Sequence, residues 1–218
     1  FLKYLLVGGE AASAHHLHQC ISDQSGSLDE ILYTYGPTES TTFTTYCYLT
    51  REMTRKGELP IGRPISNSSV YVLDSHLNPV PIGAIGELYI GGAGLARGYL
   101  NQPELTAERF ILNPFSKAKT RLYKTGDLVR YSPDGNLEHM GRNDFQVKIR
   151  GYRIELGEIE TALSMYPAVK QCVVLSKTQG DRQYLVAYYV SDEIVSHEVW
   201  VQHLSERLPD YMMPSAFI

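Results

Sequence analysis

Metal-binding cysteine pairs, long apolar runs and secretion signals are absent from this sequence, and each absence excludes a class of protein. Its 218 residues include three widely spaced cysteines and no Cys-x-x-Cys or His-x-x-x-His pair, so no metal site is indicated and a reducing cytoplasm is expected. No apolar run approaches the roughly 20 residues that cross a bilayer, and no basic start precedes a small-residue cleavage site. We therefore expect a soluble protein.

The sequence also lacks a large excess of acidic or basic residues. Acidic residues number 24 and basic residues 20, which gives a net charge of -4, and no long basic run occurs. This balance indicates a small molecule or a protein as partner, and neither nucleic acid nor a membrane. The chain also lacks internal repeats, low-complexity segments and an initiator methionine, and it opens inside an apolar run. We expect an internal fragment on these grounds.

The N-terminal segment, residues 5–21, predicts a βα unit. Residues 5–7 are apolar and precede two glycines, which is typical of a buried strand that ends in a turn, and residues 10–21 have helical character. The histidines at positions 15, 16 and 18 could be metal ligands. Their spacing does not place all three on one helical face, which favours a solvated helix.

The rest of the chain changes from β-rich to mixed. Between residues 60 and 141, short β-rich runs alternate with Gly and Pro and predict a small barrel or sandwich, with a hairpin turn at 132–136. Residues 156–165 have the spacing of an amphipathic helix. Strands at 173–175 and 184–190 and a helix at 197–208 then predict a small α+β domain.

Residues 35–39 read Tyr-Gly-Pro-Thr-Glu and combine an aromatic ring, a tight turn, a hydroxyl and a carboxylate. An aromatic face can stack on a base, backbone amides and a Thr hydroxyl can donate to a phosphate, and a carboxylate can hold Mg²⁺. Gly-Pro is also a common loop signal. Taken alone, these residues indicate either a nucleotide site or a turn.

Residues 123–127 read Tyr-Lys-Thr-Gly-Asp and place the carboxylate of Asp127 just after an expected glycine turn. A carboxylate can accept two hydrogen bonds from a ribose diol. An aspartate at this place can equally cap the turn itself. Spacing does not separate these two interpretations.

Residues 141–160 form the densest motif, with four bases, four acids and three glycines around a short apolar alternation. Together with the segments 6–10, 35–39, 86–100 and 123–127, in that order, this motif resembles the adenylation domain of nonribosomal peptide synthetases, within the wider class of adenylate-forming enzymes. The resemblance spans nearly the whole chain.

The resemblance implies an adenylate-forming enzyme fold that is truncated at both ends. An α/β and β-rich large-domain portion would be followed by a small α+β domain. Residues 1–143 would be the C-terminal part of the large AMP-binding domain, with a βα portion over 1–59 and a β-rich subdomain over 60–143. Residues 144–218 would be the small C-terminal domain, incomplete.

The activity that the resemblance implies has two half-reactions at one site. ATP, with Mg²⁺, and an amino acid form an aminoacyl-AMP with loss of pyrophosphate, and the acyl group then passes to the phosphopantetheine thiol of a peptidyl carrier domain. Neighbouring synthetase domains would be the other partners. Attack of a carboxylate on an α-phosphate needs positioning and charge neutralisation more than a proton-abstracting base.

The resemblance also assigns roles to single residues of the nucleotide site. Tyr35 would stack on adenine, Thr38 would contact the α-phosphate, and Glu39 would ligate Mg²⁺. Asp127 and Arg142 would hold the ribose hydroxyls. Many relatives carry Asn two residues before the tyrosine, where this chain has a tyrosine, so one contact to the base is in doubt.

Three further features follow from the resemblance. Asp144 would be the hinge about which the small domain turns, because a hinge needs few contacts and adaptable torsions. In the segment after it, Lys148 and Gly151 would belong to the face that meets the thiol arm, unless this segment is only a β-hairpin with a charged face. The side chain of the amino acid would be lined by Leu5, Val7, Thr34, Thr42 and Phe43.

Two catalytic parts of the family would lie outside the chain. A phosphate loop rich in glycine and Ser/Thr would precede Phe1, and the late catalytic lysine would follow Ile218, so we expect the 218 residues alone to be inactive. Two alternatives to a peptide-synthetase domain stay open. One is another adenylate-former such as an acyl-CoA synthetase, and the other is a non-catalytic binding fragment.

Overall fold

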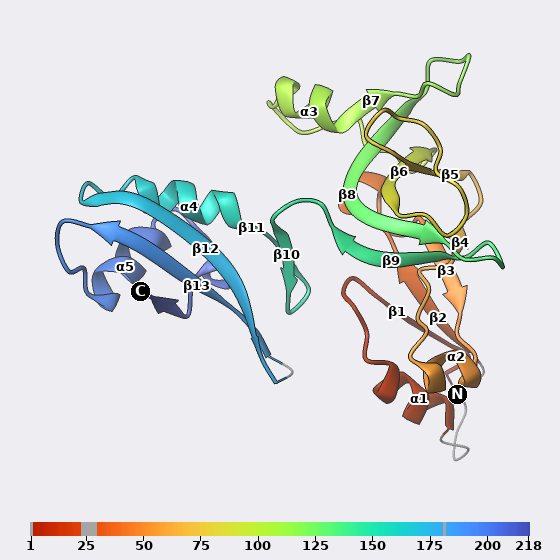
Figure 1. Ribbon diagram of the computed structural model, residues 1–218, viewed down its shortest axis with the longest axis horizontal. Coiled ribbons are helices and arrows are strands. Elements are labelled where there is room, and N and C mark those ends of the chain that lie inside the picture. The colour runs from red at the N-terminus through yellow and green to blue at the C-terminus, as the bar shows by residue number, and fades with distance from the viewer. Residues whose placement is uncertain (1, 23–29, 181) are drawn as a thin grey trace. The chain divides into compact units, whose positions relative to one another are not determined.

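The computed structural model describes residues 2–22, 30–180 and 182–218, and the chain divides into two compact units, Phe1–Asn143 and Asp144–Ile218 (Figure 1). Among the described segments, no helix is long and apolar enough to span a membrane. The cysteines, at positions 20, 47 and 172, are free thiols.

A mixed sheet begins the first unit. Its elements are β1 (Tyr4–Gly8), α1 (Ala14–Ser22), β2 (Glu30–Tyr35), η1 (Thr38–Ser40), β3 (Thr45–Tyr48), α2 (Arg51–Lys56) and β4 (Arg63–Pro64). The strand order is β1-β2-β3-β4, with β1 parallel to β2 and the other pairs antiparallel. Helix α1 follows β1 and connects it to the parallel strand β2, so the predicted βα unit is confirmed. Leu17 of α1 packs with Ile31 and Cys47 in the buried core on one face of this sheet.

Helix α1 begins later than the sequence predicted. Helical character was expected from Glu10, whereas α1 begins at Ala14. The Tyr33 hydroxyl donates a hydrogen bond to the Glu10 carbonyl at 3.3 Å and accepts one at 3.4 Å from the backbone amide two residues further on. These two bonds hold the segment before α1 against the sheet. Ser13 accepts a hydrogen bond from the His16 amide. A serine in this place satisfies a donor at the helix start and so sets where the helix begins.

The second sheet of this unit is β-rich, as predicted. Its elements are β5 (Ser68–Leu73), β6 (Gly86–Gly92), α3 (Pro103–Arg109), β7 (Phe110–Leu112), β8 (Arg121–Tyr131) and β9 (Leu137–Arg142). The strand order is β5-β6-β8-β7, and β9 pairs with the other half of β8. β8 and β9 form the predicted hairpin, whose turn is closed by the Ser132 amide on the Asn136 carbonyl at 2.9 Å.

The segment that was expected to be a glycine turn at residues 123–127 is instead a β-bulge within β8. Glu87 of β6 pairs with Leu128, and Tyr89 pairs with Lys124, so a longer stretch of β8 faces a shorter stretch of β6. Gly126 has a φ of 76° at this point. Glycine adopts this left-handed conformation without strain, and a bulge turns the side chains that follow it. The expectation of a turn was wrong because the pairing on both sides of the glycine continues.

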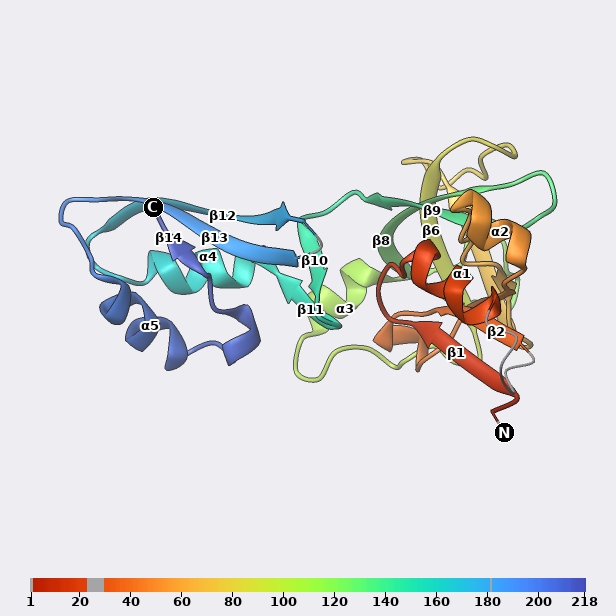
Figure 2. The same ribbon diagram turned by 90° about the horizontal axis from the view of Figure 1, so that it is seen from below.

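The second unit is a small α+β structure. Its elements are β10 (Gln146–Ile149), β11 (Tyr152–Glu155), α4 (Leu156–Ser164), β12 (Val169–Gln179), β13 (Arg182–Ser191), α5 (His197–Ser205), η2 (Asp210–Met212) and β14 (Ala216–Phe217). β10 and β11 form a hairpin, and the larger sheet has the order β12-β13-β14. The predicted helices and strands are present, with longer strands than the apolar runs indicated. Figure 2 shows α4 and α5 on the same side of the sheet.

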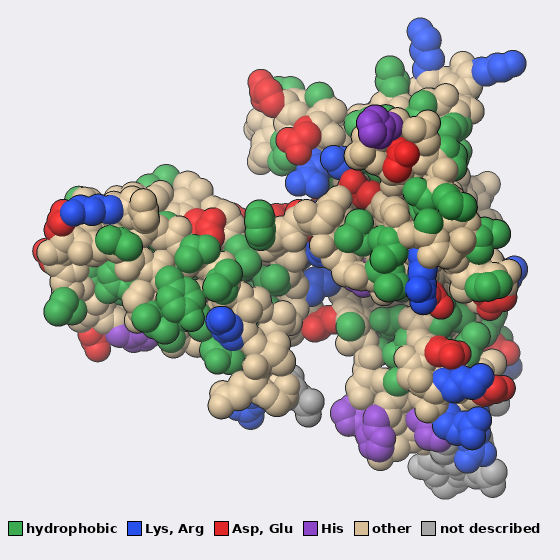
Figure 3. Space-filling model, in the orientation of Figure 1, with side chains coloured by type: hydrophobic (Ala, Val, Ile, Leu, Met, Phe, Trp, Pro, Cys, Tyr) green, Lys and Arg blue, Asp and Glu red, His purple; other side chains and the backbone are tan. Residues whose placement is uncertain are grey.

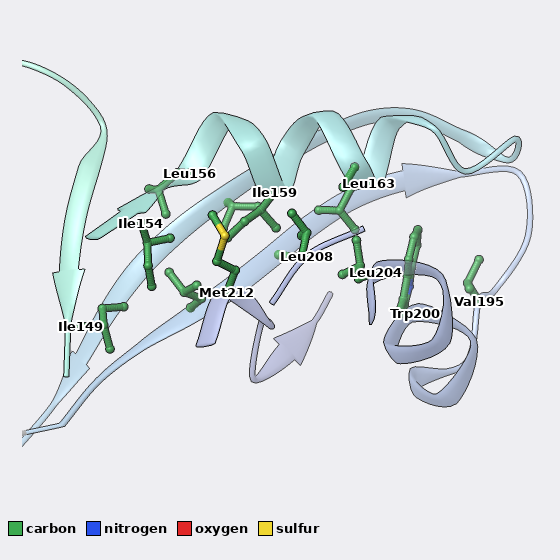
Figure 4. Packing of buried hydrophobic residues seen from close by; sticks show 14 residues of the cluster. Ile149, Ile154, Leu156, Ile159, Leu163, Val195, Trp200, Leu204, Leu208 and Met212 are labelled. Carbon is green, nitrogen blue, oxygen red and sulfur yellow. The ribbon is translucent and has the colours of Figure 1, made fainter. Parts of the chain in front are cut away.

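A single buried core joins the helices of the second unit to its sheet (Figure 4). Ile159 and Leu163 of α4 and Leu204 of α5 are fully buried there. Trp200 of α5 is also fully buried, and its ring stacks on Phe217 with centroids 5.6 Å apart. The apolar spacing of α4 therefore faces the sheet, as an amphipathic helix requires.

The opposite face of this sheet is apolar and exposed. Val173, Leu175 and Val190 are 44%, 39% and 54% exposed, and Figure 3 shows hydrophobic side chains gathered over β12 and β13. Side chains alternate between the two faces of a strand, so these residues point away from Val174, which lies in the core. The core of the second unit thus lies on one side of its sheet.

We predict that Ile159→Ala lowers the free energy of unfolding of the second unit by about 2–5 kcal/mol, because it removes buried methyl groups and leaves a cavity. Trp200 is the only tryptophan of the chain, so its fluorescence during urea unfolding reports on this unit. The matched control is Ile194→Ala, since Ile194 is 101% exposed, and it should change stability by less than about 0.5 kcal/mol. Equal effects of the two changes would contradict this packing.

Candidate functional site

The Tyr-Gly-Pro-Thr-Glu segment lies in a tight loop between β2 and β3. The Thr44 amide donates to the Tyr35 carbonyl at 2.8 Å and closes the loop. A Cβ at Gly36 would overlap the Thr42 carbonyl oxygen, so only glycine fits there. Thr38 begins η1 and is exposed, whereas Glu39 is buried. The loop presents a hydroxyl outward and holds a carboxylate inside.

A buried carboxylate lies beside the start of this loop. Asp127 of β8 accepts hydrogen bonds from the Tyr35 hydroxyl at Oδ2 and from Arg142 Nη1 at Oδ1, the latter at 2.6 Å. His139 Nε2 lies 3.2 Å from the same Oδ1. Arg142 also donates to the Thr125 carbonyl at 3.0 Å, which fixes its guanidinium. The structure therefore brings together three of the predicted nucleotide residues, which are distant in sequence.

The ionisation of this cluster follows from its contacts. Burial alone would raise the pKa of Asp127, but the hydrogen bond from His139, the charge of Arg142 and the hydrogen bond from Tyr35 outweigh burial and lower that pKa. Burial, the charge of Asp127 and the hydrogen bond to Asp127 raise the pKa of Tyr35 well above its usual value. At neutral pH the carboxylate is ionised and the phenol keeps its proton.

Glu39 is held in the same way by a second tyrosine. The Tyr99 hydroxyl donates to Glu39 Oε1 at 2.6 Å, and burial together with this bond raises the pKa of Tyr99. The Ala96 amide donates to the Glu39 carbonyl at 2.8 Å, and Arg121 in turn donates to the Ala96 and Arg97 carbonyls. The glycine-rich segment after β6 therefore fastens the acidic loop from outside.

The residues predicted to line the amino-acid pocket fall on different surfaces. Leu5 and Val7 pack against the core that α1 covers. Thr34 pairs with Gly8 and lies on the other face of the sheet, where its hydroxyl donates to the Val7 carbonyl at 3.1 Å. Thr42 and Phe43 are exposed in the loop. The described residues thus do not gather these positions on one face, and the pocket stays a prediction.

Asp144, the predicted hinge, is the first residue of the second unit. Its Oδ1 accepts a hydrogen bond from the Gln146 amide at 3.2 Å, a local turn of the kind that aspartate favours. The side-chain amide of Gln146 donates to Glu155 across the hairpin. The hydrogen bond from the Gln146 amide therefore connects the Asp144 side chain to the start of β10.

The predicted thiol-arm face lies on the β10–β11 hairpin. Lys148 is paired with Arg153 across its strands. Arg150 and Gly151 form the two-residue turn with φ values of 53° and 79°. Positive φ at both positions is typical of a type I′ turn, whose twist matches that of the strands. The positive φ of the turn thus explains why a glycine is found at position 151, and the role of Gly151 towards a thiol arm stays a prediction.

Sequence reasoning missed His139 and Tyr99 as members of the site. His139 reaches Asp127 because β8 and β9 pair, and Tyr99 reaches Glu39 because a loop folds back. The one signal that could have located His139 is the predicted hairpin at residues 132–136, since counting outward from the turn places it near Asp127. For Tyr99 no local pattern carries the information.

Two family models match the chain. The model of the AMP-binding enzyme matches residues 1–100, and that of the AMP-binding enzyme C-terminal domain matches residues 158–218. The chain belongs to the AMP-binding enzyme family. The resemblance to nonribosomal peptide synthetases is confirmed by relatives that match all of the chain.

Malpibaldin synthetase from Mortierella alpina is 52% identical over 219 residues, which are 100% of this chain and 4% of that protein. Tyrocidine synthase 3 from Brevibacillus parabrevis is 49% identical over 220 residues, which are 100% of this chain and 3% of that protein. The chain thus spans only a small part of the length of these relatives.

Solved structures confirm the predicted fold. An artificially fused adenylation-PCP di-domain NRPS from Klebsiella oxytoca is 30% identical, has a TM-score of 0.80 and matches 99% of this chain and 40% of its own. A holo NRPS protein containing adenylation and PCP domains, bound to a vinylsulfonamide inhibitor, is 30% identical with a TM-score of 0.86 over 100% of this chain and 37% of its own.

We predict that Asp127→Asn destabilises the first unit by roughly 1–3 kcal/mol at pH 7, because it removes the ionised acceptor of the cluster. The pKa of Asp127 is lowered on folding, so its stabilisation is present above the ordinary aspartate pKa of about 3.9 and is lost as pH falls through the lowered value. The difference from the unchanged chain should therefore shrink in acid. Urea unfolding followed by far-UV circular dichroism at several pH values measures it.

The control for this pH series is Asp192→Asn. Asp192 is exposed in the second unit and pairs with Lys170, so its replacement should have little effect at any pH. A stability difference for Asp127→Asn that stays constant from neutral pH into acid would contradict the lowered pKa.

Proposed function

We propose that this chain is part of an amino-acid-activating adenylation domain of a nonribosomal peptide synthetase. The unit Phe1–Asn143 would be the C-terminal part of the large AMP-binding domain, and Asp144–Ile218 would belong to the small domain. The proposed reaction joins ATP and an amino acid to aminoacyl-AMP with release of pyrophosphate. The observation that carries this proposal is the cluster in which Tyr35, Arg142 and His139 surround the ionised carboxylate of Asp127.

The cluster suits a ribose and a base. A carboxylate must be ionised to accept two hydrogen bonds from a diol, and the lowered pKa of Asp127 supplies this state. Its oxygens offer about four acceptor positions, of which Tyr35, Arg142 and His139 take three. A ribose would therefore take the remaining position and compete for another. The hydrogen bond from the Tyr35 hydroxyl fixes the tilt of the Tyr35 ring, which we propose stacks on adenine.

The loop after β2 suits the phosphates and a cation. Thr38 is exposed, and we propose that its hydroxyl contacts an α-phosphate oxygen. Glu39 fits a ligand of Mg²⁺, because its carboxylate is held in a fixed orientation by Tyr99 and a carboxylate offers several acceptor positions. When bound there, Mg²⁺ would offset the negative charge that gathers on the phosphates. Tyr99 would hold the carboxylate in place during this.

The second half-reaction involves the second unit and its partners. We propose that Asp144 is the pivot and that Lys148 and Gly151 lie on the face that meets a phosphopantetheine thiol. The PCP domains of the similar solved structures support a peptidyl carrier domain as partner. We also propose neighbouring synthetase domains as partners, because the relatives are much longer than this chain. A reducing cytoplasm is the proposed location, which suits the free cysteines.

Amino-acid-dependent exchange of pyrophosphate into ATP, measured on the full-length protein with each of the twenty amino acids, tests this function. The pocket residues Leu5, Val7, Thr34, Thr42 and Phe43 predict that a medium-sized side chain with some polarity is activated. Asp127→Ala should raise the KM for ATP by at least about tenfold, since the ribose loses a charged acceptor worth roughly 1.5–3 kcal/mol.

The same exchange assay with fatty acids separates the alternative of an acyl-CoA synthetase. Exchange that depends on a fatty acid and on no amino acid would contradict the proposal. Unaltered ATP kinetics in Asp127→Ala would remove Asp127 from the ribose site.

We predict that Asp144→Pro slows transfer to the carrier thiol at least about tenfold more than it slows aminoacyl-AMP formation. Proline locks φ near −65°, so the pivot would lose a torsion that only the change between the two half-reactions requires. Single-turnover measurements of each half-reaction test this. Asp144→Asn is the matched control, because it keeps the acceptor for the Gln146 amide and a free φ. Equal slowing of both steps by Asp144→Pro would argue against the pivot.

A further inference from the structure

Glu87 of β6 lies beside the site and is bound from several directions. Its Oε1 accepts a hydrogen bond from the Gly126 amide at 3.0 Å, and its Oε2 accepts one from Asn143 Nδ2 at 3.0 Å. The Tyr89 hydroxyl and Lys124 Nζ lie 3.5 Å and 4.0 Å from Oε2. The Glu87 side chain is only 11% exposed. A carboxylate held this closely is rigid, and each of its oxygens serves a different segment.

The first of these segments is the bulge that carries Asp127. The Thr125 hydroxyl donates to the Leu88 carbonyl at 2.7 Å and accepts from the Asp127 amide at 2.9 Å. The Gly126 amide between them turns to Glu87 instead of to a strand partner. A bulge leaves its extra residues without ladder bonds, so side chains must satisfy them. Glu87 and Thr125 do this together, and they thereby fix the direction of Asp127.

The second segment is the end of the first unit. The Asn143 amide donates to the Gly126 carbonyl at 2.9 Å, and its side chain donates to Glu87. Asn143 is the last residue of this unit, and Asp144 begins the next. The chain is thus fastened up to Asn143 by two bonds that both lead to the same bulge. The next residue, Asp144, accepts a hydrogen bond from the Gln146 amide of the second unit.

We propose that Glu87 is a positioning residue that clamps two points at once, the bulge that aims Asp127 and the last residue of the first unit, Asn143, which precedes the proposed pivot Asp144. One carboxylate would then set both the geometry of the ribose site and the place where the joint begins. This inference rests on the proposed function for the meaning of the ribose site and the joint. The clamp itself rests only on the contacts of Glu87.

The two roles can be separated by substitution. Glutamine at this position keeps one carbonyl oxygen, which can still accept from the Gly126 amide, but its NH₂ group cannot accept from Asn143 Nδ2, so Asn143 must turn its side-chain amide over and accept from glutamine. Glu87→Gln should therefore weaken the hold on Asn143, because the bond to a charged carboxylate is lost, and should spare the bulge. Asn143→Ala should have the same effect from the other side, whereas Glu87→Ala removes both bonds.

The test compares these variants in the full-length protein by two measurements. Hydrogen exchange of the amide at position 143 should become at least about fivefold faster in Glu87→Gln, Asn143→Ala and Glu87→Ala. In pyrophosphate exchange, the KM for ATP should rise about fivefold or more in Glu87→Ala with a smaller change in kcat, and should stay within about twofold in the other two. Glu138→Gln is the control, because Glu138 pairs with Arg130 at the other end of β8 and β9, and it should change neither measurement.

Several results would overturn the proposal. An unchanged rate of amide hydrogen exchange at position 143 in all three variants would show that Glu87 does not hold Asn143. An equal rise in the KM for ATP in Glu87→Gln and Glu87→Ala would contradict the separation of roles, and faster exchange throughout β5 and β7 in Glu87→Ala would indicate general destabilisation instead of positioning. If the unchanged protein shows no pyrophosphate exchange, the proposed function fails, while the exchange at position 143 still decides the clamp.

Discussion

The candidate site depends on keeping one carboxylate ionised in a buried place. Removing Asp127 from water disfavours its charge, and the neighbours reverse that effect with the His139 ring, the guanidinium of Arg142 and the Tyr35 hydroxyl. These donors come from the end of β2 and from β9, so the fold must bring separate strands to the same point. The bulge at Gly126 is what directs the aspartate towards them. If that bulge were a regular ladder, the donors would lose their acceptor.

A buried acid that accepts a hydrogen bond from a tyrosine occurs a second time in the first unit. Glu39 is buried and receives the Tyr99 hydroxyl, as Asp127 receives that of Tyr35. In both pairs the pKa of the phenol is raised, so it remains a donor over the whole neutral range. A tyrosine can thus hold a carboxylate in a fixed orientation while it keeps its own proton.

How much of this could be predicted depends on the range of each interaction. Helix α4, the hairpin at 132–136 and the βα unit follow from periodicity and turn residues within a few positions, and they are present. The motifs also named Asp127 and Arg142 in advance through the family resemblance. The bulge, the Tyr99 contact and the clamp of Glu87 depend on which residues face one another across strands. That register is set by the packing of the whole sheet, which a local pattern does not contain.

The two units differ in what they require of the joint between them. The second unit has its own core, in which Ile159, Leu163 and Trp200 are fully buried, so its stability does not rest on the torsions of Asp144. The first unit ends at Asn143, which is held by the same bulge that aims Asp127. If Asp144 is the pivot, as proposed, a rotation there would leave the hydrogen bonds of Asn143 to the bulge in place. A pivot one residue earlier would pull on Gly126 and with it on Asp127.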